Sequence, residues 1–237
     1  MRATLLLACC LSVAAFAQQK KILFMGEGDI LQALQSVTDK AKIVPVTTAN
    51  VMQELPDADA FIGSIKPEYV RAGKKLQWTQ IMSAGVETVL HRSGGDDLKK
   101  SNIVLTNNQI VQGPEIADHA MAMLLTLSRG IHTFIGHRAT ETWQPRPYPG
   151  IELNGRTGLV IGCGGIGSQI ALRAWAFGMK IICVDPEDIP YSPFITKTVK
   201  PDQLDEVVPQ ADVVFISAPH TEKSHKMMGP KQFDLMK

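Results

Sequence analysis

Short apolar runs alternate with amphipathic stretches along the first half of the chain. The apolar runs, each bounded by turn-forming residues, occupy residues 21–25, 43–46, 60–63, 76–82 and 103–106. Runs of this kind are typical of buried strands. Between the first two, Ile30, Leu31, Leu34 and Val37 recur with helical spacing. Strands that alternate with helices predict an α/β fold with a parallel sheet.

A long apolar helix is predicted over residues 114–132. Pro114 and Glu115 suit its first turn, and Arg129 suits its last. Because apolar residues cover most of its circumference, we expect the helix to be buried between two layers or two domains. The proline-rich residues 142–150 that follow predict an ordered surface connection.

The alternation resumes after this connection. Strands are expected at residues 157–162, 180–185, 195–199 and 212–216, and helices after residue 167, at 202–208 and from 230. This half therefore predicts a second parallel α/β unit.

Glycines 162, 164 and 167 have the G-x-G-x-x-G spacing between a strand and a helix. The first glycine allows a tight turn, the second leaves room for a diphosphate, and the third lets helix and strand pack closely. The helix start offers N–H groups and a partial positive charge to that diphosphate. Asp185 follows the next strand, where it would accept hydrogen bonds from ribose hydroxyls and repel a 2′-phosphate. This context predicts NAD binding in preference to NADP, with a merely structural turn as the alternative.

Gly26 and Gly28 also follow a strand, but no third glycine stands at the right spacing. We interpret this pair as a strand-end turn.

The composition narrows the possible partners. The chain has 237 residues and a net charge of +1, so no basic surplus indicates nucleic acid or a charged membrane surface. The sequence shows no metal-ligand cluster. Cys163 and Cys183 are expected on neighbouring strands as two partly buried thiols, with a redox pair as the alternative. A disulfide framework is not indicated.

The first residues have the pattern of a secretory signal. Arg2 precedes an almost wholly apolar stretch over residues 3–16, and Ala15-Phe16-Ala17 has the small-x-small form of a cleavage site. We expect residues 1–17 to be removed and the protein to be exported, to the periplasm or the medium. The stretch is too short to span a membrane. The alternative is an uncleaved apolar N-terminus on a cytoplasmic protein. Export conflicts with the expected cofactor, because free dinucleotide is scarce outside the cytoplasm.

Several segments, in the same order, resemble the D-isomer-specific 2-hydroxyacid dehydrogenase family. They are residues 80–87, the helix at 115–129, residues 153–157, the glycine turn with Asp185, and residues 217–224. The resemblance covers the chain from about residue 21 to its end. The form of residues 83–86, Ser-Ala-Gly-Val, looks most like the glyoxylate/hydroxypyruvate reductase branch.

The resemblance implies a fold of two domains. A flavodoxin-like substrate domain would occupy residues 18–113, and an incomplete Rossmann NAD-binding domain residues 114–237. It also implies a homodimer in the full-length form.

The resemblance further implies a set of site residues. Backbone N–H groups of Ala84 and Gly85 would hold the substrate carboxylate. The cofactor would lie against Gly162, Gly164, Gly165, Ile166, Gly167, Asp185, Ala218, Pro219 and Ser224. Asp118 stands where the family usually has Glu on the linking helix.

By this resemblance the parent protein is an NAD-dependent oxidoreductase of a small D-2-hydroxy acid or 2-keto acid, of the glyoxylate or hydroxypyruvate type. The family uses an Arg, a Glu and a His that fall beyond Lys237, so we assign no catalytic residue and expect this chain to be an inactive fragment. His220 is a weak candidate for a proton donor. A non-catalytic NAD-binding interaction or sensor protein of the same fold is the alternative, and an enzyme for formate or phosphite is a third.

Overall fold

The computed structural model describes residues 19–92, 96–144 and 150–237. The chain divides into two compact units. The first comprises Met1–Gln80 with Lys100–Leu105, and the second Ile81–Lys99 with Thr106–Lys237. The predicted signal at residues 1–17 lies outside the described residues, as do residues 145–149 of the proline-rich connection.

The first sheet has five strands in the order β2-β1-β3-β4-β5. They are β1 (Lys20–Phe24), β2 (Ala41–Pro45), β3 (Ala60–Ile62), β4 (Trp78–Gln80) and β5 (Val104–Thr106). β1 pairs in parallel with β2 and β3, and β3 pairs in parallel with β4. This order is that of flavodoxin-like sheets, which confirms the predicted fold.

The helices of this region are short. They are α1 (Asp29–Val37), α2 (Val51–Glu54), the 3-10 turn η1 (Leu55–Asp57), α3 (Pro67–Ala72), the π-helical turn η2 (Thr88–Arg92) and α4 (Asp97–Lys100). Every residue of the central strand β3 is buried, because a parallel strand inside a sheet is covered on both faces. The side chains of Leu23, Val51, Leu55 and Phe61 are fully buried. The first unit therefore owns a core of its own.

The second sheet has four parallel strands in the order β8-β7-β6-β9. They are β6 (Thr157–Ile161), β7 (Lys180–Val184), β8 (Lys197–Val199) and β9 (Val213–Ile216). Numbered from β6, the order is third, second, first, fourth, which is the order of a Rossmann sheet. The order reverses between β6 and β9, and open α/β sheets bind ligands at the carboxyl ends of strands at such a point.

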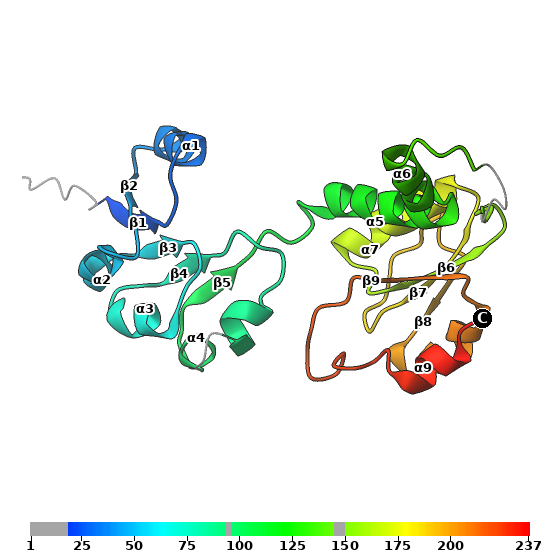
Figure 1. Ribbon diagram of the computed structural model, residues 1–237. Coiled ribbons are helices and arrows are strands. Elements are labelled where there is room, and N and C mark those ends of the chain that lie inside the picture. Colours follow the sequence, from blue (N-terminus) through cyan, green and yellow to red (C-terminus); the bar gives the residue numbers. More distant parts are fainter. Residues whose placement is uncertain (1–18, 93–95, 145–149) are drawn as a thin grey trace, which may run out of the picture. The chain divides into compact units, whose positions relative to one another are not determined.

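Helices cover both faces of this sheet (Figure 1). They are α5 (Gly113–Ser128), α6 (Ile131–Ala139), α7 (Gly165–Ala176), α8 (Leu204–Val207) and α9 (Pro230–Leu235), with 3-10 turns η3 (Pro201–Gln203) and η4 (Val208–Gln210) flanking α8. Val160 packs with residues of α5 and α7, whereas Leu159 and Ile161 pack with residues of α8 and η4. Side chains of a strand point alternately to its two faces, so this division follows from the strand geometry.

The predicted single helix at 114–132 is wrong in one respect. Gly130 has a φ of 63°, and this left-handed residue ends α5 and starts α6. The expected burial between two layers or two domains holds for only one face of α5 within this unit. One stripe of α5, including Ala117 and Met121, is buried against α7, but Met123 and Leu127 are 53% and 66% exposed. Because α7 is the main neighbour of α5, with a smaller contact from α6, only that side of the helix is buried.

The described helices include none that is both long and apolar enough to cross a membrane.

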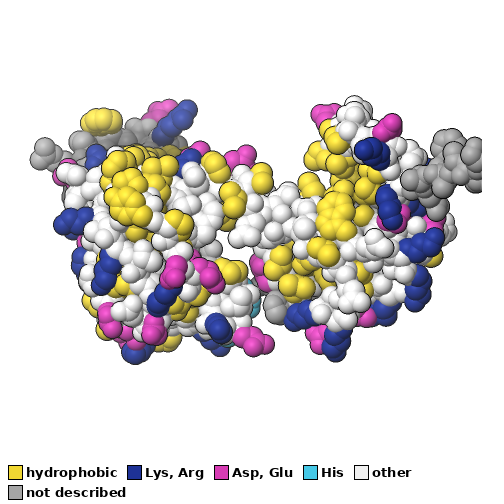
Figure 2. Space-filling model, turned by 180° about the vertical axis from the view of Figure 1, so that it is seen from behind, with side chains coloured by type: hydrophobic (Ala, Val, Ile, Leu, Met, Phe, Trp, Pro, Cys, Tyr) yellow, Lys and Arg dark blue, Asp and Glu magenta, His cyan; other side chains and the backbone are white. Residues whose placement is uncertain are grey.

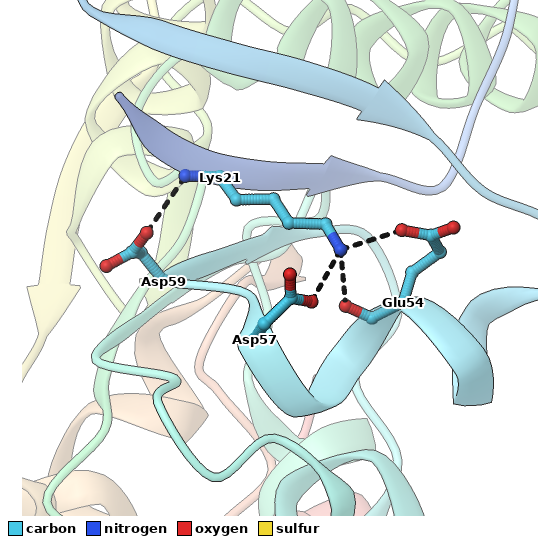
Figure 3. Close-up of polar contacts among 4 residues, drawn as sticks. All are labelled: Lys21, Glu54, Asp57 and Asp59. Atoms are coloured by element: carbon cyan, nitrogen blue, oxygen red, sulfur yellow. Dashed lines mark hydrogen bonds and ion pairs between the residues drawn. The ribbon is translucent and has the colours of Figure 1, made fainter. Parts of the chain in front are cut away.

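An ion cluster lies at the amino-terminal end of the strands of the first sheet (Figure 3). Nζ of Lys21 lies 2.7 Å from Oε2 of Glu54 and 2.6 Å from Oδ1 of Asp57. The backbone N–H of Lys21 donates to Oδ2 of Asp59, and Nζ of Lys20 contacts Oδ1 of the same carboxylate at 2.8 Å. The cluster lines a cavity of about 410 Å³. Ligands of open α/β sheets bind at the opposite side, at the carboxyl ends of the strands. We therefore interpret the cluster as structural.

The cluster shifts the pKa of its groups. The hydrogen bond from Lys21 holds the pKa of Asp57 below its ordinary value of 3.8, and bonds from Lys20 and the Lys21 backbone do the same for Asp59. Burial alone lowers the pKa of Lys21, but its bonds to Asp57 and Glu54 outweigh that effect, and the pKa is raised above 10.5. The carboxylates therefore stabilise the fold above pH 3.8, and this contribution is lost as pH falls through their lowered pKa values.

We expect Asp59→Asn to lower the free energy of unfolding at pH 7 by about 1 kcal/mol, because it removes a charged partner of two donors at a partly exposed site. The difference should shrink as the pH falls from 7 towards 2, because the parent carboxyl takes up a proton as the pH passes through its lowered pKa. Urea unfolding followed by circular dichroism at both pH values measures this. Asp39→Asn, on an exposed turn, is the matched control. A difference that persists unchanged at pH 2 would contradict the interpretation.

Candidate functional site

The turn after β6 is the centre of the site. Gly162 has a φ of 86°, and its N–H donates to the carbonyl of Val184 at the end of β7. A Cβ on Gly162 would stand 2.5 Å from the backbone nitrogen of Ala218, which follows β9. Only glycine satisfies both the left-handed conformation and this close approach. The turn therefore brings the ends of β6, β7 and β9 together.

The other two glycines of the motif have different surroundings. A Cβ on Gly167 would stand 1.9 Å from the carbonyl oxygen of Gly162, so α7 packs directly against the turn. A Cβ on Gly164 would meet nothing within 4 Å. Gly167 therefore allows α7 to pack closely against the turn, whereas Gly164 borders open space.

This open space lies at the start of α7. Gly165 is the first residue of the helix, and no side chain among the described residues caps its N-terminus. The N–H groups of a first helical turn have no partner inside the helix and favour a negative charge. Open space beside Gly164 next to such a helix start fits a diphosphate, with Gly165 and Ile166 in the first turn.

Asp185 directly follows β7 and is 8% exposed. Its Oδ2 accepts the N–H of Cys163 at 2.7 Å, and its Oδ1 accepts the N–H of Glu187 at 2.9 Å. Each carboxylate oxygen has capacity for a further donor. The structure thus holds the predicted ribose acid in a defined orientation beside the glycine turn.

The residues after β9 complete this group. Ser217 donates its hydroxyl to the carbonyl of Gly162, which fixes Ala218 beside the turn. Ser224 donates to the carbonyl of Pro219 at 2.6 Å and accepts the N–H of Thr221 at 2.8 Å. Ser224 therefore closes the loop that carries Ala218 and Pro219.

Ala84 and Gly85 belong to the segment that follows β4. The side-chain amide of Asn107 donates to the carbonyl of Ala84, and that of Asn108 donates to the carbonyl of Met82. Ser83 donates to the carbonyl of Gly85 at 2.9 Å. The two asparagines, which the sequence analysis did not single out, orient this segment through its carbonyls. Adjacent amide residues directly after a predicted strand were the available signal.

Contacts around α7 also escaped prediction. Asp118 of α5 forms an ion pair with Arg173 of α7, so the residue that departs from the family pattern links two helices. Ile110 has a φ of 77°, and its Cα would lie 2.7 Å from a Cβ on Gly165. A β-branched residue is strained in the left-handed region, and Ile110 adopts it where its backbone packs closely against Gly165.

The expectation of two partly buried thiols is wrong. Cys163 and Cys183 form a disulfide, with their Cα atoms 6.1 Å apart, and they are 4% and 0% exposed. Cys163 stands in the turn rather than on β6, and this brings its side chain to the neighbouring strand β7. The predicted adjacency of the two residues is confirmed, but sequence spacing alone could not show that the side chains meet.

A family model described as "D-isomer specific 2-hydroxyacid dehydrogenase, NAD binding domain" matches residues 121–237. D-3-phosphoglycerate dehydrogenase of Methanocaldococcus jannaschii is 29% identical over 88% of this chain and 40% of its own length. Hydroxypyruvate reductase of Thermotoga maritima is 27% identical over 79% of this chain and 60% of its own length. Residues 121–237 therefore belong to the NAD-binding domain of the D-isomer-specific 2-hydroxyacid dehydrogenase family.

A solved structure agrees with this assignment. D-lactate dehydrogenase of Aquifex aeolicus, complexed with NAD and lactic acid, has a TM-score of 0.72 and 25% identity over 92% of this chain and 66% of that chain. The matched domain of the family binds NAD. The chain spans about 40% and 60% of the two curated relatives, so it represents part of the length of a family member.

Gly164→Ala tests the open space directly. We expect the free energy of unfolding to stay within about 0.5 kcal/mol of the parent, because the new methyl group meets no atom in the unliganded chain. NADH should bind at least about tenfold more weakly, because the methyl group would occupy the approach of the diphosphate. Fluorescence titration with NADH and urea unfolding measure the two effects.

Gly136→Ala in α6 is the matched control, since a Cβ there also meets nothing within 4 Å. It should leave NADH binding unchanged. A Gly164→Ala chain with the affinity of the parent would show that the diphosphate does not lie against this turn.

Proposed function

We propose that this chain binds NAD at the turn after β6, within an oxidoreductase that acts on a small D-2-hydroxy acid or 2-keto acid of the glyoxylate or hydroxypyruvate type. The observation that carries the proposal is the glycine turn at the reversal of strand order, with Asp185 held beside it. Membership of the family supports the reaction class, and the hydroxypyruvate reductase among the relatives supports the substrate type.

Different residues of the chain bind different parts of the cofactor. The first turn of α7, with Gly165 and Ile166, receives the diphosphate, and Asp185 accepts hydrogen bonds from the adenosine ribose. Its negative charge repels a 2′-phosphate, so NAD is bound in preference to NADP. Ala218 and Pro219, beside Gly162, line the other side of the site. When bound, NAD exchanges a hydride with the substrate carbon.

We propose that the N–H groups of Ala84 and Gly85 bind the substrate carboxylate. The hydrogen bond from Asn107 to the carbonyl of Ala84 supports this, because that carbonyl shares its peptide group with the N–H of Gly85 and so fixes the direction of that N–H. The hydrogen bond from Ser83 to the carbonyl of Gly85 restrains the next peptide group of the same segment. A preorganised pair of N–H donors is a common way to hold an anion without a charged side chain.

The proton donor is proposed to lie outside residues 1–237. Nε2 of His220 lies 3.1 Å from Nδ1 of His225, and both residues are exposed. A general acid needs a defined position against the substrate oxygen. The Arg, Glu and His that the family resemblance implies are therefore assigned to another part of the whole protein.

We expect this chain to bind NADH and to reduce neither glyoxylate, hydroxypyruvate nor pyruvate at a measurable rate. NADH fluorescence titration, with NADPH as the matched comparison, measures binding, and absorbance at the nicotinamide band measures turnover. NADPH should bind at least about tenfold more weakly, because its 2′-phosphate meets Asp185. Turnover by this chain would place a proton donor among its own residues.

The same assays applied to the full-length protein separate the two candidate functions. Reduction of one of these keto acids identifies the enzyme. NADH binding without reduction of any of them identifies a non-catalytic NAD-binding or sensor protein of the same fold. Failure of both chains to bind NADH would refute the proposal.

We also propose that the full-length protein is a homodimer joined through its Rossmann domain. Leu127 of α5 and Ile135 of α6 are 66% and 64% exposed, and hydrophobic side chains gather on a face of this unit (Figure 2). Apolar patches of this kind are typical of interfaces. A two-fold dimer would bury the same patch of both copies.

Leu127→Asp combined with Ile135→Asp should convert the dimer to a monomer, because two charges would be buried without partners in each copy. Light scattering after size exclusion should then give about half the mass. Val37→Asp, at a 76% exposed position of α1, is the control and should leave the mass unchanged. A parent protein that is already monomeric would contradict the dimer.

We also propose that the protein is exported. The Cys163–Cys183 disulfide supports it, because disulfides persist mainly in oxidising compartments. The mass of the mature protein measures the cleavage directly, and a first residue other than Gln18 would contradict the predicted site.

A further inference from the structure

The disulfide stands at a particular place in the cofactor site. Cys163 is the residue between Gly162 and Gly164 of the glycine turn. Cys183 lies on β7, two residues before Asp185. The covalent bond therefore joins the segment proposed to face the diphosphate to the strand that delivers the ribose acid.

A second link joins the same two segments. The N–H of Cys163 donates to Oδ2 of Asp185 at 2.7 Å. Cys183 is paired in register with Val160, which lies three residues before Cys163. The turn thus bends back over β7. It is linked to that strand and to the residue after it by the disulfide, by the N–H of Cys163 on Asp185 and by the N–H of Gly162 on Val184.

The disulfide is enclosed by apolar side chains. Both cysteines belong to the cluster that includes Met121 of α5 and Ile170 and Ala171 of α7. Two reduced cysteines would fill the same apolar space as small hydrophobic residues. What the covalent bond adds is a restraint on the turn, beyond the packing of the side chains.

We propose that the Cys163–Cys183 disulfide is a redox-sensitive positioning device for the NAD site. In the oxidised chain the turn is preorganised for the diphosphate, and NADH binds tightly. In the reduced chain the turn loses its covalent link to β7 and keeps its hydrogen bonds to Val184, Asp185 and Ser217. Part of its order must then be gained when NADH binds, which weakens affinity. This inference rests on the proposed binding of NAD at the turn after β6.

The chemistry is thiol–disulfide exchange with a small disulfide oxidant or a dithiol reductant. On oxidation, the two thiols lose two protons and two electrons, the Sγ–Sγ bond forms, and the disulfide of the oxidant becomes two thiols. On reduction, a dithiol returns the two electrons and two protons and closes its own disulfide. An exported protein meets oxidising conditions, so the tight form is the one expected there.

Peptide mapping establishes the bond itself. Trypsin without reductant should release residues 157–173, which contain Cys163, linked to residues 181–197, which contain Cys183. The linked mass should disappear on reduction, and the two separate peptides should appear. Absence of the linked peptide from the full chain purified without reductant would overturn the inference.

NADH titration of the full chain, with and without a water-soluble phosphine reductant, tests the effect on the site. We expect reduction to weaken NADH binding about tenfold, as lost preorganisation does in binding sites of this kind. Cys163→Ala combined with Cys183→Ala should bind like the reduced parent and should not respond to the reductant. Circular dichroism verifies that each chain is folded.

Met121→Ala separates positioning from stability. It opens a cavity in the same apolar cluster but leaves the disulfide in place, so it should lower the urea midpoint and still respond to the reductant as the parent does. Equal NADH affinity of the oxidised parent, the reduced parent and the double variant would overturn the inference and leave NAD binding standing. Failure of the oxidised parent to bind NADH would overturn both.

Discussion

Three backbone segments cross at the end of β6 with no room for a side chain between them. The carbonyl of Gly162 lies where a Cβ of Gly167 would stand, and the backbone of Ala218 lies where a Cβ of Gly162 would stand. This close approach is possible only because both positions are glycine and because Gly162 adopts a φ of 86°. It sets the start of α7 over the carboxyl end of the sheet, beside Asp185 and the segment after β9.

The neighbours of this crossing hold it by different interactions. Asp185 accepts the N–H of Cys163, Ser217 donates to the carbonyl of Gly162, and Cys163 is bonded to Cys183. These contacts come from β7 and from the segment after β9, which lie on either side of β6 in the sheet. A site built at the reversal of strand order is thus supported from both neighbouring strands. The same geometry leaves the space beside Gly164 open.

The helices of the second unit carry both an ion pair between two of them and exposed apolar side chains. Asp118 and Arg173 join α5 to α7, while the neighbouring surface of α5 and α6 exposes Leu127 and Ile135. The first unit owns a separate core and a separate ion cluster at the amino edge of its sheet. The substrate-binding role proposed for Ala84 and Gly85 and the cofactor-binding role proposed for the glycine turn belong to segments that follow different strands, β4 and β6. The proposed reaction needs both segments, because the hydride passes between the bound cofactor and the bound substrate.

The sequence by itself determined the strands, the parallel α/β class and the glycine turn with its acid, because apolar strand runs and G-x-G-x-x-G are local patterns. It also placed Cys163 and Cys183 near each other. Only the tertiary structure decided that the two cysteines are bonded, that Asn107 and Asn108 orient the segment of Ala84, and that Gly130 divides the apolar helix. Contacts between residues far apart in the chain depend on the direction of each side chain after folding. No spacing along the sequence records that direction.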